Sequence, residues 1–283
     1  MRRPTKIIPR SLPTETKAQE PPDELPETPH FLQGVALRFD DVEEQVGLIS
    51  TALGSPSDLA VRRISDGIVC LFLSPLVDQG AVRHSLVGPL SEADWSELQE
   101  KGQAARLLPV AGVSEARSVE AAVDRVAEGE TALIVHGRPT PYTLDLRGRV
   151  ARQVSPPISE PSVRGPRDSF TENLFDNLSL VRQRIRSRDL RVRELTVGLD
   201  TRTRVAVCYL EGRASPEVVD AAIQRLSTVT APAVIDSSYL VPYLSKRTWS
   251  LFPPAAATER ADRACAAIVQ GRIVVICDNS PFA

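Results

Sequence analysis

The feature that most restricts the possible folds of this chain is an order of helices and strands that occurs twice. In each half, an apolar-striped helix precedes a short strand, a further helical stretch follows, and a helix, a glycine and a strand close the unit. The expected ranges are 42–53, 68–73, 78–89, 119–127 and 132–135 in the first half, and 170–185, 205–210, 215–227, 261–269 and 273–276 in the second. This order predicts an α/β fold of two similar subdomains that arose by duplication.

Details within the two halves also match. Segment 57–64, with Asp58 before an apolar residue, resembles segment 188–195, in which Asp189 has the same position. When the following strands are aligned, Cys70 coincides with Cys208. His136 and Asp278 then occupy the same turn, and in each half a proline follows three residues later. We therefore expect His136 to have a turn role that it shares with Asp278 rather than a catalytic one.

Proline-rich stretches divide the chain. Residues 1–33 combine proline with charged and polar residues and few apolar ones, so we expect a disordered arm. The first α/β subdomain is expected at 34–150, a Pro-rich linker at 151–166 and the second α/β subdomain at 167–283. A length of 283 residues agrees with two subdomains.

Composition excludes several classes of function. A net charge of −2 gives no overall attraction to nucleic acid. No apolar run is long enough to span a bilayer, and the basic N-terminus lacks the apolar stretch of a signal peptide, so the chain by itself is expected to be soluble and intracellular. The four cysteines, which form no Cys-x-x-Cys pair, are expected to be buried thiols.

We find no pattern typical of an enzyme. His30, His84 and His136 are isolated from one another, and the sequence has no nucleophile elbow, phosphate-binding loop or dinucleotide fingerprint. The prediction is a non-catalytic protein that needs no cofactor and no metal.

The segment around residues 165–188 is the most informative one for identity. Ser169 is predicted as the N-cap of a helix, with Glu172 completing a capping box. Pro166 excludes helix before this point, and Asp168 places negative charge at the positive end of the helix dipole. An apolar stripe follows at Phe170, Leu174, Leu178, Val181 and Ile185.

Arginines collect where this helix is expected to end, namely Arg182, Arg184, Arg186 and Arg188, with Arg191 and Arg193 in the extended segment beyond. One interpretation is a site where several guanidinium groups contact a small anion or a protein partner. The other is a solvated helix end whose cations suit the dipole and pair locally with Asp189 and Glu194. The sequence leaves both open.

Six short motifs in this order make the chain resemble the A subunits of the GerA-type spore germinant receptors. They are Gly165-Pro166-Arg167-Asp168, the pair Phe170 and Glu172, Arg182-x-Arg184-Ile185, Tyr209-Leu210-Glu211-Gly212, Thr258-Glu259-Arg260 and Gly271-Arg272-Ile273-Val274-Val275. The resemblance runs from about Glu160 to the last residue and is weaker upstream.

The resemblance implies a cytoplasm-facing domain in the inner membrane assembly of the spore, without enzymatic activity. Its implied partners are a transporter-like B subunit, a lipoprotein C subunit and further copies of itself. Nutrient sensing would be coupled to ion release. The residues themselves leave two interpretations of Gly165, Pro166, Arg167, Asp168 and Glu172: a junction between linker and helix, or a contact with a neighbouring subunit or the membrane-embedded part. The segment after Gly271 would approach the first membrane segment, and Asn279 stands where the family usually has glycine or another small residue.

A second hypothesis comes from another class of protein. Two α/β lobes with a cleft between them would make a stand-alone module that binds a small ligand. Saturable binding of an amino acid or a sugar by the purified chain would favour this hypothesis.

Overall fold

A computed structural model describes residues 41–91, 98, 103–110, 112–148, 160, 166, 168–244 and 255–283. The predicted arm 1–33 lies outside these residues, as does most of the predicted linker 151–166. The proposed boundaries at 34–150, 151–166 and 167–283 therefore stay predictions. We call residues 41–148 the N-lobe and residues 168–283 the C-lobe.

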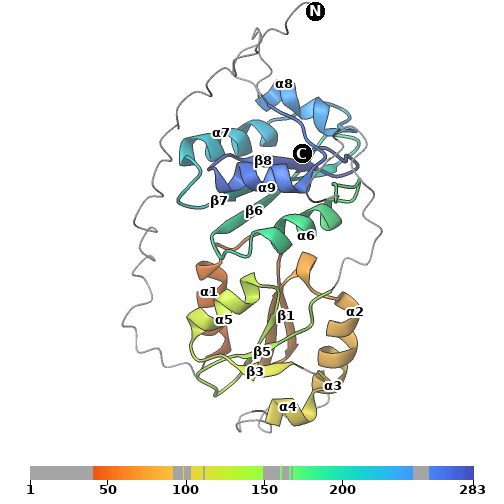
Figure 1. Cartoon of the computed structure of the whole chain (residues 1–283). Coiled ribbons are helices and arrows are strands. Elements are labelled where there is room, and N and C mark those ends of the chain that lie inside the picture. Colours follow the sequence, from red (N-terminus) through yellow and green to blue (C-terminus); the bar gives the residue numbers. More distant parts are fainter. Residues whose placement is uncertain are drawn as a thin grey trace, which may run out of the picture. The chain divides into compact units, whose positions relative to one another are not determined.

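The N-lobe contains a five-stranded antiparallel sheet in the order β1-β2-β4-β5-β3. Its strands are β1 (Leu59–Ser65), β2 (Ile68–Leu73), β3 (Val113–Glu115), β4 (Thr131–Val135) and β5 (Tyr142–Leu144). Every residue of β2 and β4 is buried. These strands are apolar without alternation because helices cover both faces of the sheet (Figure 1).

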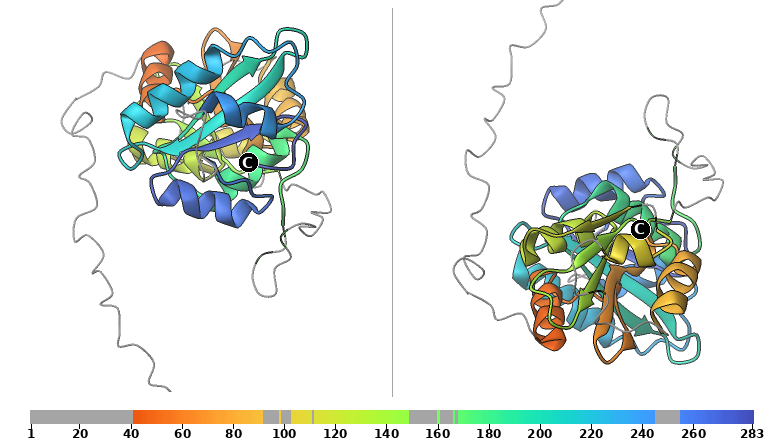
Figure 2. Two further views of the ribbon diagram at one scale, coloured as in Figure 1. Left: turned by 90° about the horizontal axis from the view of Figure 1, so that it is seen from above. Right: turned by 90° about the horizontal axis from the view of Figure 1, so that it is seen from below.

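Two groups of helices cover the two faces of this sheet. Helices α1 (Val42–Ala52) and α5 (Val119–Ala127) pack on the face that carries Leu71 and Ile134. The opposite face, with Ile68 and Phe72, contacts the other group. That group consists of α2 (Gln79–Val82), the π-helical turn η3 (Arg83–Val87), α3 (Gly88–Ser91) and α4 (Gln103–Leu107), and the short 3-10 turn η2 (Ser74–Leu76) follows β2. The right-hand view of Figure 2 shows α1 and the α2–α3 segment on opposite sides of the strands.

The C-lobe repeats this layering on a smaller, three-stranded antiparallel sheet, in the order β6-β7-β8. The strands are β6 (Leu190–Val197), β7 (Thr203–Leu210) and β8 (Val274–Cys277). Helices α6 (Leu174–Arg184) and α9 (Ala261–Val269) cover one face, and α7 (Pro216–Ser227), the 3-10 turn η5 (Ser237–Leu240) and α8 (Val241–Leu244) cover the other. In the left-hand view of Figure 2, α7 and α9 lie on opposite sides of β8.

The predicted fold class is confirmed, because both lobes are mixed helix-and-sheet units. The turn that His136 and Asp278 were expected to share has the same backbone geometry in both lobes. The amide of His136 donates to the carbonyl of Gly67, and the amide of Asp278 donates to the carbonyl of Arg204. The next residues, Gly137 and Asn279, both have a positive φ. The lobes thus share a helix, a two-stranded hairpin, further helices and a closing helix and strand, whereas β3 and β5 of the N-lobe have no counterpart among the described residues of the C-lobe. The duplication itself stays a prediction.

The predicted coincidence of Cys70 and Cys208 is wrong by one residue. Ile68 lies opposite the last residue of β4, and Val205 lies opposite the last residue of β8. Cys70 is two residues after Ile68, but Cys208 is three residues after Val205. Because side chains alternate along a strand, Cys70 faces away from α1 and α5, whereas Cys208 faces α6 and α9.

The start of α6 also differs from its prediction. The N-cap is Asn173, whose side-chain oxygen accepts from the amides of Phe175 and Asp176 at 2.9 and 3.1 Å. Ser169 instead forms an isolated β-bridge with Arg260. The residues before Asn173 are not helical, because the amide of Phe170 donates to the distant carbonyl of Glu259 and the amide of Thr171 donates to Oδ1 of Asn177. The predicted apolar stripe is nevertheless buried in a single cluster.

Candidate functional site

The boundary between the lobes contains a buried ion pair. Arg182, on α6, meets Asp58, which directly precedes β1, in a two-point contact with Nε–Oδ2 and Nη2–Oδ1 distances of 2.9 and 2.8 Å. Both side chains are only 2% exposed. The third nitrogen of Arg182, Nη1, donates to the carbonyl of Leu190 at 3.0 Å. The guanidinium is therefore fully engaged within the chain.

Backbone contacts continue this boundary along β6. The amide of Ser57 donates to the carbonyl of Val192 at 2.9 Å, and the amide of Glu194 donates to Oγ of Ser57 at 3.0 Å. On α6, Oγ of Ser179 donates to the carbonyl of Pro75. We call the ion pair and these contacts the interlobe seam.

Arg191 adds a second arginine to the interlobe seam. Its Nη1 donates to the carbonyl of Leu53, at the end of α1, at 2.7 Å, and its Nε lies 3.4 Å from a carboxylate oxygen of Glu211. Gly54 follows Leu53 with φ +72°, and a Cβ built there would lie 2.2 Å from Nε of Arg191. Glycine thus allows the arginine to lie against the backbone of the N-lobe.

The four arginines that the sequence singled out have different surroundings. For Arg182, the expected contact with an external anion or partner is replaced by the intrachain pair with Asp58, because the side chain is buried. Arg188 approaches Asp124 of the N-lobe at 3.9 Å. Arg184 pairs with Asp168, and Arg186 is exposed with its Nε on the carbonyl of Gln183 at 3.2 Å. The acids that were expected to pair with these arginines, Asp189 and Glu194, are not among their partners here. Glu194 pairs with Arg204 instead.

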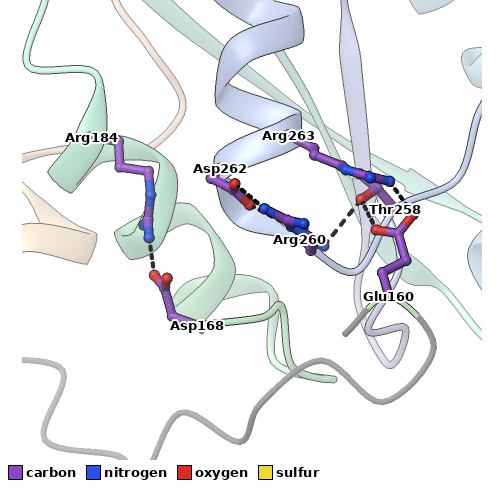
Figure 3. Close-up of polar contacts among 7 residues, drawn as sticks. All are labelled: Glu160, Asp168, Arg184, Thr258, Arg260, Asp262 and Arg263. Carbon is purple, nitrogen blue, oxygen red and sulfur yellow. Dashed lines mark hydrogen bonds and ion pairs between the residues drawn. The ribbon is translucent and has the colours of Figure 1, made fainter. Parts of the chain in front are cut away.

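A second polar cluster lies at the start of α9, around Thr258, Glu259 and Arg260, which we call the C-lobe junction (Figure 3). Glu160 is its central carboxylate, accepting from Oγ1 of Thr258 at 2.7 Å and from Nη1 of Arg263 at 2.6 Å. The backbone amide of Glu160 donates to Oε1 of Glu259 at 2.8 Å. The residue that sequence analysis placed in the linker is therefore held to the C-lobe.

Charges at the C-lobe junction are matched in pairs. Arg260 contacts Asp262 through Nε and Nη2 at 3.0 and 2.5 Å. The hydrogen bond from Arg260 lowers the pKa of Asp262 below its ordinary value, against the effect of burial. Nearby, Arg184 and Asp168 make the separate pair that Figure 3 also shows.

Backbone hydrogen bonds join two further segments to the C-lobe junction. The amide of Phe170 donates to the carbonyl of Glu259 at 2.7 Å. Thr258 and Ala283 exchange two hydrogen bonds of 3.0 Å each. The tripeptide Thr258-Glu259-Arg260 thus contacts three segments: the linker residue Glu160, the approach to α6 and the last residue of the chain.

The N-terminus of α6 is also held by the C-terminal residues. The amide of Leu174 donates to Oδ1 of Asp278 at 3.0 Å, and the amide of Asn279 donates to the carbonyl of Glu172 at 2.7 Å. Asn279 has φ +65°, a conformation that glycine adopts without strain and asparagine tolerates. This explains why glycine or asparagine suits the turn.

The predicted contact motif is only partly described. Gly165 and Arg167 lie outside the described residues, Pro166 is exposed, and the side chain of Glu172 is exposed while its carbonyl makes the contact above. Sequence reasoning missed Asp58, Glu160, Asp262 and Arg263 as members of these clusters. The sequence did mark the position of Asp58, since an acid precedes the first strand of each lobe. It could not identify the partner, because Arg182 lies 124 residues away.

Reactive chemistry has little support in the described part of the chain. All four cysteines are free and buried. Burial raises the pKa of Cys70 and Cys265 to about 11 and that of Cys208 and Cys277 to about 12. Thiolates are therefore scarce at neutral pH. Across the described ranges, no group of three or more His, Cys, Asp or Glu residues is placed to hold a metal ion.

Within those same ranges, no helix has both the length and the apolar character that crossing a bilayer requires.

Comparisons with known proteins agree with each other. The sequence model of the family described as Bacillus/Clostridium GerA spore germination protein matches residues 48–283. The chain is similar to the uncharacterized membrane protein YfkQ of Bacillus subtilis, with 33% identity over 175 residues, covering 62% of this chain and 34% of the relative. It is also similar to spore germination protein KA of Bacillus subtilis, with 28% identity over 238 residues, covering 81% of this chain and 44% of the relative.

A solved structure has the same fold. It is the N-terminal domain of the A subunit of the Bacillus megaterium spore germinant receptor GerK3, with 23% identity and a TM-score of 0.60. The match covers 86% of this chain and 93% of the other. In contrast, this chain spans less than half the length of the two Bacillus subtilis relatives.

Proposed function

Because the chain belongs to the Bacillus/Clostridium GerA spore germination protein family, we propose that it is the cytoplasm-facing domain of a germinant-receptor A subunit. In this proposal, the domain couples nutrient sensing to ion release through assembly and regulatory contacts. Its partners are a transporter-like B subunit, a lipoprotein C subunit and further copies of the A subunit, in the inner membrane of the spore.

One observation supports the coupling role most directly. The C-lobe junction connects Glu160, the approach to α6 and Ala283 through short hydrogen bonds. A change in the position of the lobes or of their linker would therefore alter the hydrogen bonds at the C-terminal end of the domain. Contiguous contacts of this kind can carry coupling between two sites when they have two discrete arrangements.

The interlobe seam supports the same proposal from the other side. Arg182 and Asp58 fix α6 to the N-lobe, and α6 begins at the C-terminal residues Asp278 and Asn279. Contacts that a neighbouring subunit makes with the N-lobe would thus be transmitted along α6. The exposed Arg186 and the motif Gly165, Pro166, Arg167, Asp168 and Glu172 remain proposed contact positions for such a subunit.

The experiment is a germination assay with the full-length gene in spores. Glu160→Gln removes the charge that Thr258 and Arg263 share, and we expect slower ion release after addition of a mixture of amino acids and sugars. The matched control is Glu43→Gln, which removes the partner of Arg63 in an exposed N-lobe pair and should leave ion release unchanged. Immunoblots of spore membranes would show that both variants accumulate equally.

A stronger form of the test deletes residues 36–283 from the full-length protein. The proposal expects germination through this receptor to be lost. Normal germination of the deletion strain would show that the domain has no part in coupling.

A further inference from the structure

The two sheets differ at one edge. In the N-lobe, β5 and β3 extend the sheet beyond β4, whereas the C-lobe sheet ends at β8 in the described residues. Both lobes otherwise reach this edge in the same way, through a helix, a glycine with positive φ and a strand that pairs with the hairpin. The glycines are Gly129 and Gly271. The N-lobe therefore indicates where further strands of the C-lobe sheet would lie.

Two pairs of residues align the lobes around this edge. After the closing strand, His136 corresponds to Asp278, because each amide donates to the carbonyl opposite it on the hairpin. Before the closing helix, Ala116 corresponds to Thr258, because each lies three residues ahead of the first residue of α5 or α9. These two correspondences are independent of each other, since they lie on opposite sides of the helix and strand.

Backbone hydrogen bonds agree with this alignment. In the N-lobe, the amide of Ala116 donates to the carbonyl of Pro141 at 3.0 Å. In the C-lobe, the amide of Thr258 donates to the carbonyl of Ala283 at 3.0 Å, and the amide of Ala283 donates back at 3.0 Å. Pro141 and Ala283 each lie five residues after the aligned turn residue. The same backbone pair is thus present in both lobes.

In the N-lobe, this backbone pair lies next to the ladder between β3 and β5. The following pairs of that ladder are Glu115 with Tyr142, Ser114 with Thr143 and Val113 with Leu144. In the C-lobe, residues 255–257 correspond to β3, since they directly precede Thr258, and they are exposed. The residues that correspond to β5 are the first three after Ala283.

The outer edge of β8 is suited to pair with such a strand. Because the amide of Asp278 donates to β7, alternation along the strand directs the amide and carbonyl of Val275 away from β7. Val275 corresponds to Leu133, which pairs with Tyr142 of β5. Among the described residues, β8 pairs with β7 alone. We call the outer edge of β8 and residues 255–257 the strand position.

We propose that the strand position binds the first three residues that follow Ala283 in the full-length protein, with β8 on one side and residues 255–257 on the other. The C-lobe sheet then has five strands in the same order as the N-lobe sheet. An occupant from the same chain is favoured because the hydrogen bonds between Thr258 and Ala283 already bring the backbone to the start of this position. The two Bacillus subtilis relatives are more than twice as long as the part of them that this chain matches.

The ladder also determines which face each added residue occupies. Tyr142 and Leu144 lie in the same apolar cluster as Leu133, and Val275 packs against the corresponding cluster of the C-lobe. The first and third residues after Ala283 therefore face α7 and η5, and we expect them to be apolar. Reading the codons after Ala283 checks this directly. A stop codon, or proline or a charged residue at both positions, would exclude the proposed strand.

A disulfide crosslink in the full-length protein tests the register. In an antiparallel ladder, the side chains of the pair next to a hydrogen-bonded pair lie close together, and residue 257 is next to the pair of Thr258 and Ala283. Ala257→Cys with a cysteine at the first position after Ala283 should therefore crosslink under mild oxidation. The matched control moves the second cysteine one residue further along, where its side chain points to the opposite face. Peptide mass spectrometry identifies the crosslinked pairs.

We expect a severalfold larger crosslinked fraction in the first pair than in the control. The reverse ratio, or an equally small fraction in both, would overturn the proposal. A crosslink between two copies, visible as a dimer on a non-reducing gel, would also overturn it, because the strand position would then belong to a second copy.

Hydrogen exchange on the unsubstituted full-length protein gives a second measurement. The amide of Val275 should exchange as slowly as that of Leu133, which has the corresponding place beside β5. Fast exchange at Val275 with slow exchange at Leu133 would contradict the added strand. Slow exchange at Val275 without the expected crosslink would assign the strand position to another segment and refute the proposal as well. Neither measurement involves nutrient or ion release, so the germination test of the proposed function is decided separately.

Discussion

The charges of Arg182 and Asp58 stabilise each other, because both side chains are buried and water cannot solvate either charge if its partner is removed. We expect Asp58→Ala to destabilise the protein by about 3–5 kcal/mol, since it leaves a buried guanidinium without its counter-charge. The double variant Asp58→Leu with Arg182→Met should recover part of this loss, because an apolar pair can replace a buried ion pair. Urea denaturation of the three proteins measures the differences. Equal stability of Asp58→Ala and the unsubstituted protein would contradict the buried pair.

At the scale of an element, α6 offers a test of which residue caps it. Asn173→Ala should cost about 1 kcal/mol, because the amides of Phe175 and Asp176 lose their acceptor. Asn173→Asp is the matched control and should retain most of the stability. Ser169→Ala, at the cap that the sequence favoured, should have a smaller effect. A larger loss for Ser169→Ala than for Asn173→Ala would restore the capping box prediction.

The other helices show which sequence signals are sufficient to predict where a helix begins and ends. Helices α5 and α9 have the predicted bounds, and α7 begins one residue after its predicted start, because their end signals are local: Ser118 caps α5, Pro216 begins α7, and Gly271 follows α9. The start of α6 was missed because Glu259 captures the amide of Phe170 from 89 positions away. No local pattern reports such a contact.

The candidate site was less predictable than the fold for the same reason. The sequence singled out Arg182, Arg184 and the Thr258-Glu259-Arg260 motif, but their carboxylate partners were not identified from it. A run of arginines looks the same whether its members face solvent or a buried acid. Only the packing of α6 on η2 decides that Arg182 lies inside and Arg186 outside.

At the scale of the whole molecule, the interlobe seam should make the two lobes unfold together. Gly54→Ala tests this, because its Cβ would meet Arg191 and disturb the seam. Gly212→Ala is a matched control, with φ +75° and no neighbouring atom within 4 Å, so it carries only the backbone strain of about 1–2 kcal/mol. Hydrogen exchange should show faster exchange of the Ser57 amide in Gly54→Ala alone. Similar exchange in both variants would show that Arg191 does not stabilise the seam.

The position of β8 has a consequence for the order in which the protein is made. The N-lobe sheet is complete once residue 144 has been synthesised, whereas the C-lobe sheet requires residues 274–277. Helix α6 is made long before Asp278, yet the amide of Leu174 has that carboxylate as its acceptor. On the ribosome, the N-lobe can therefore fold early, while the C-lobe stays open for more than a hundred further residues. Once β7 has been made, its edge that later pairs with β8 stays unpaired until residues 274–277 follow, and such an edge is prone to misassembly.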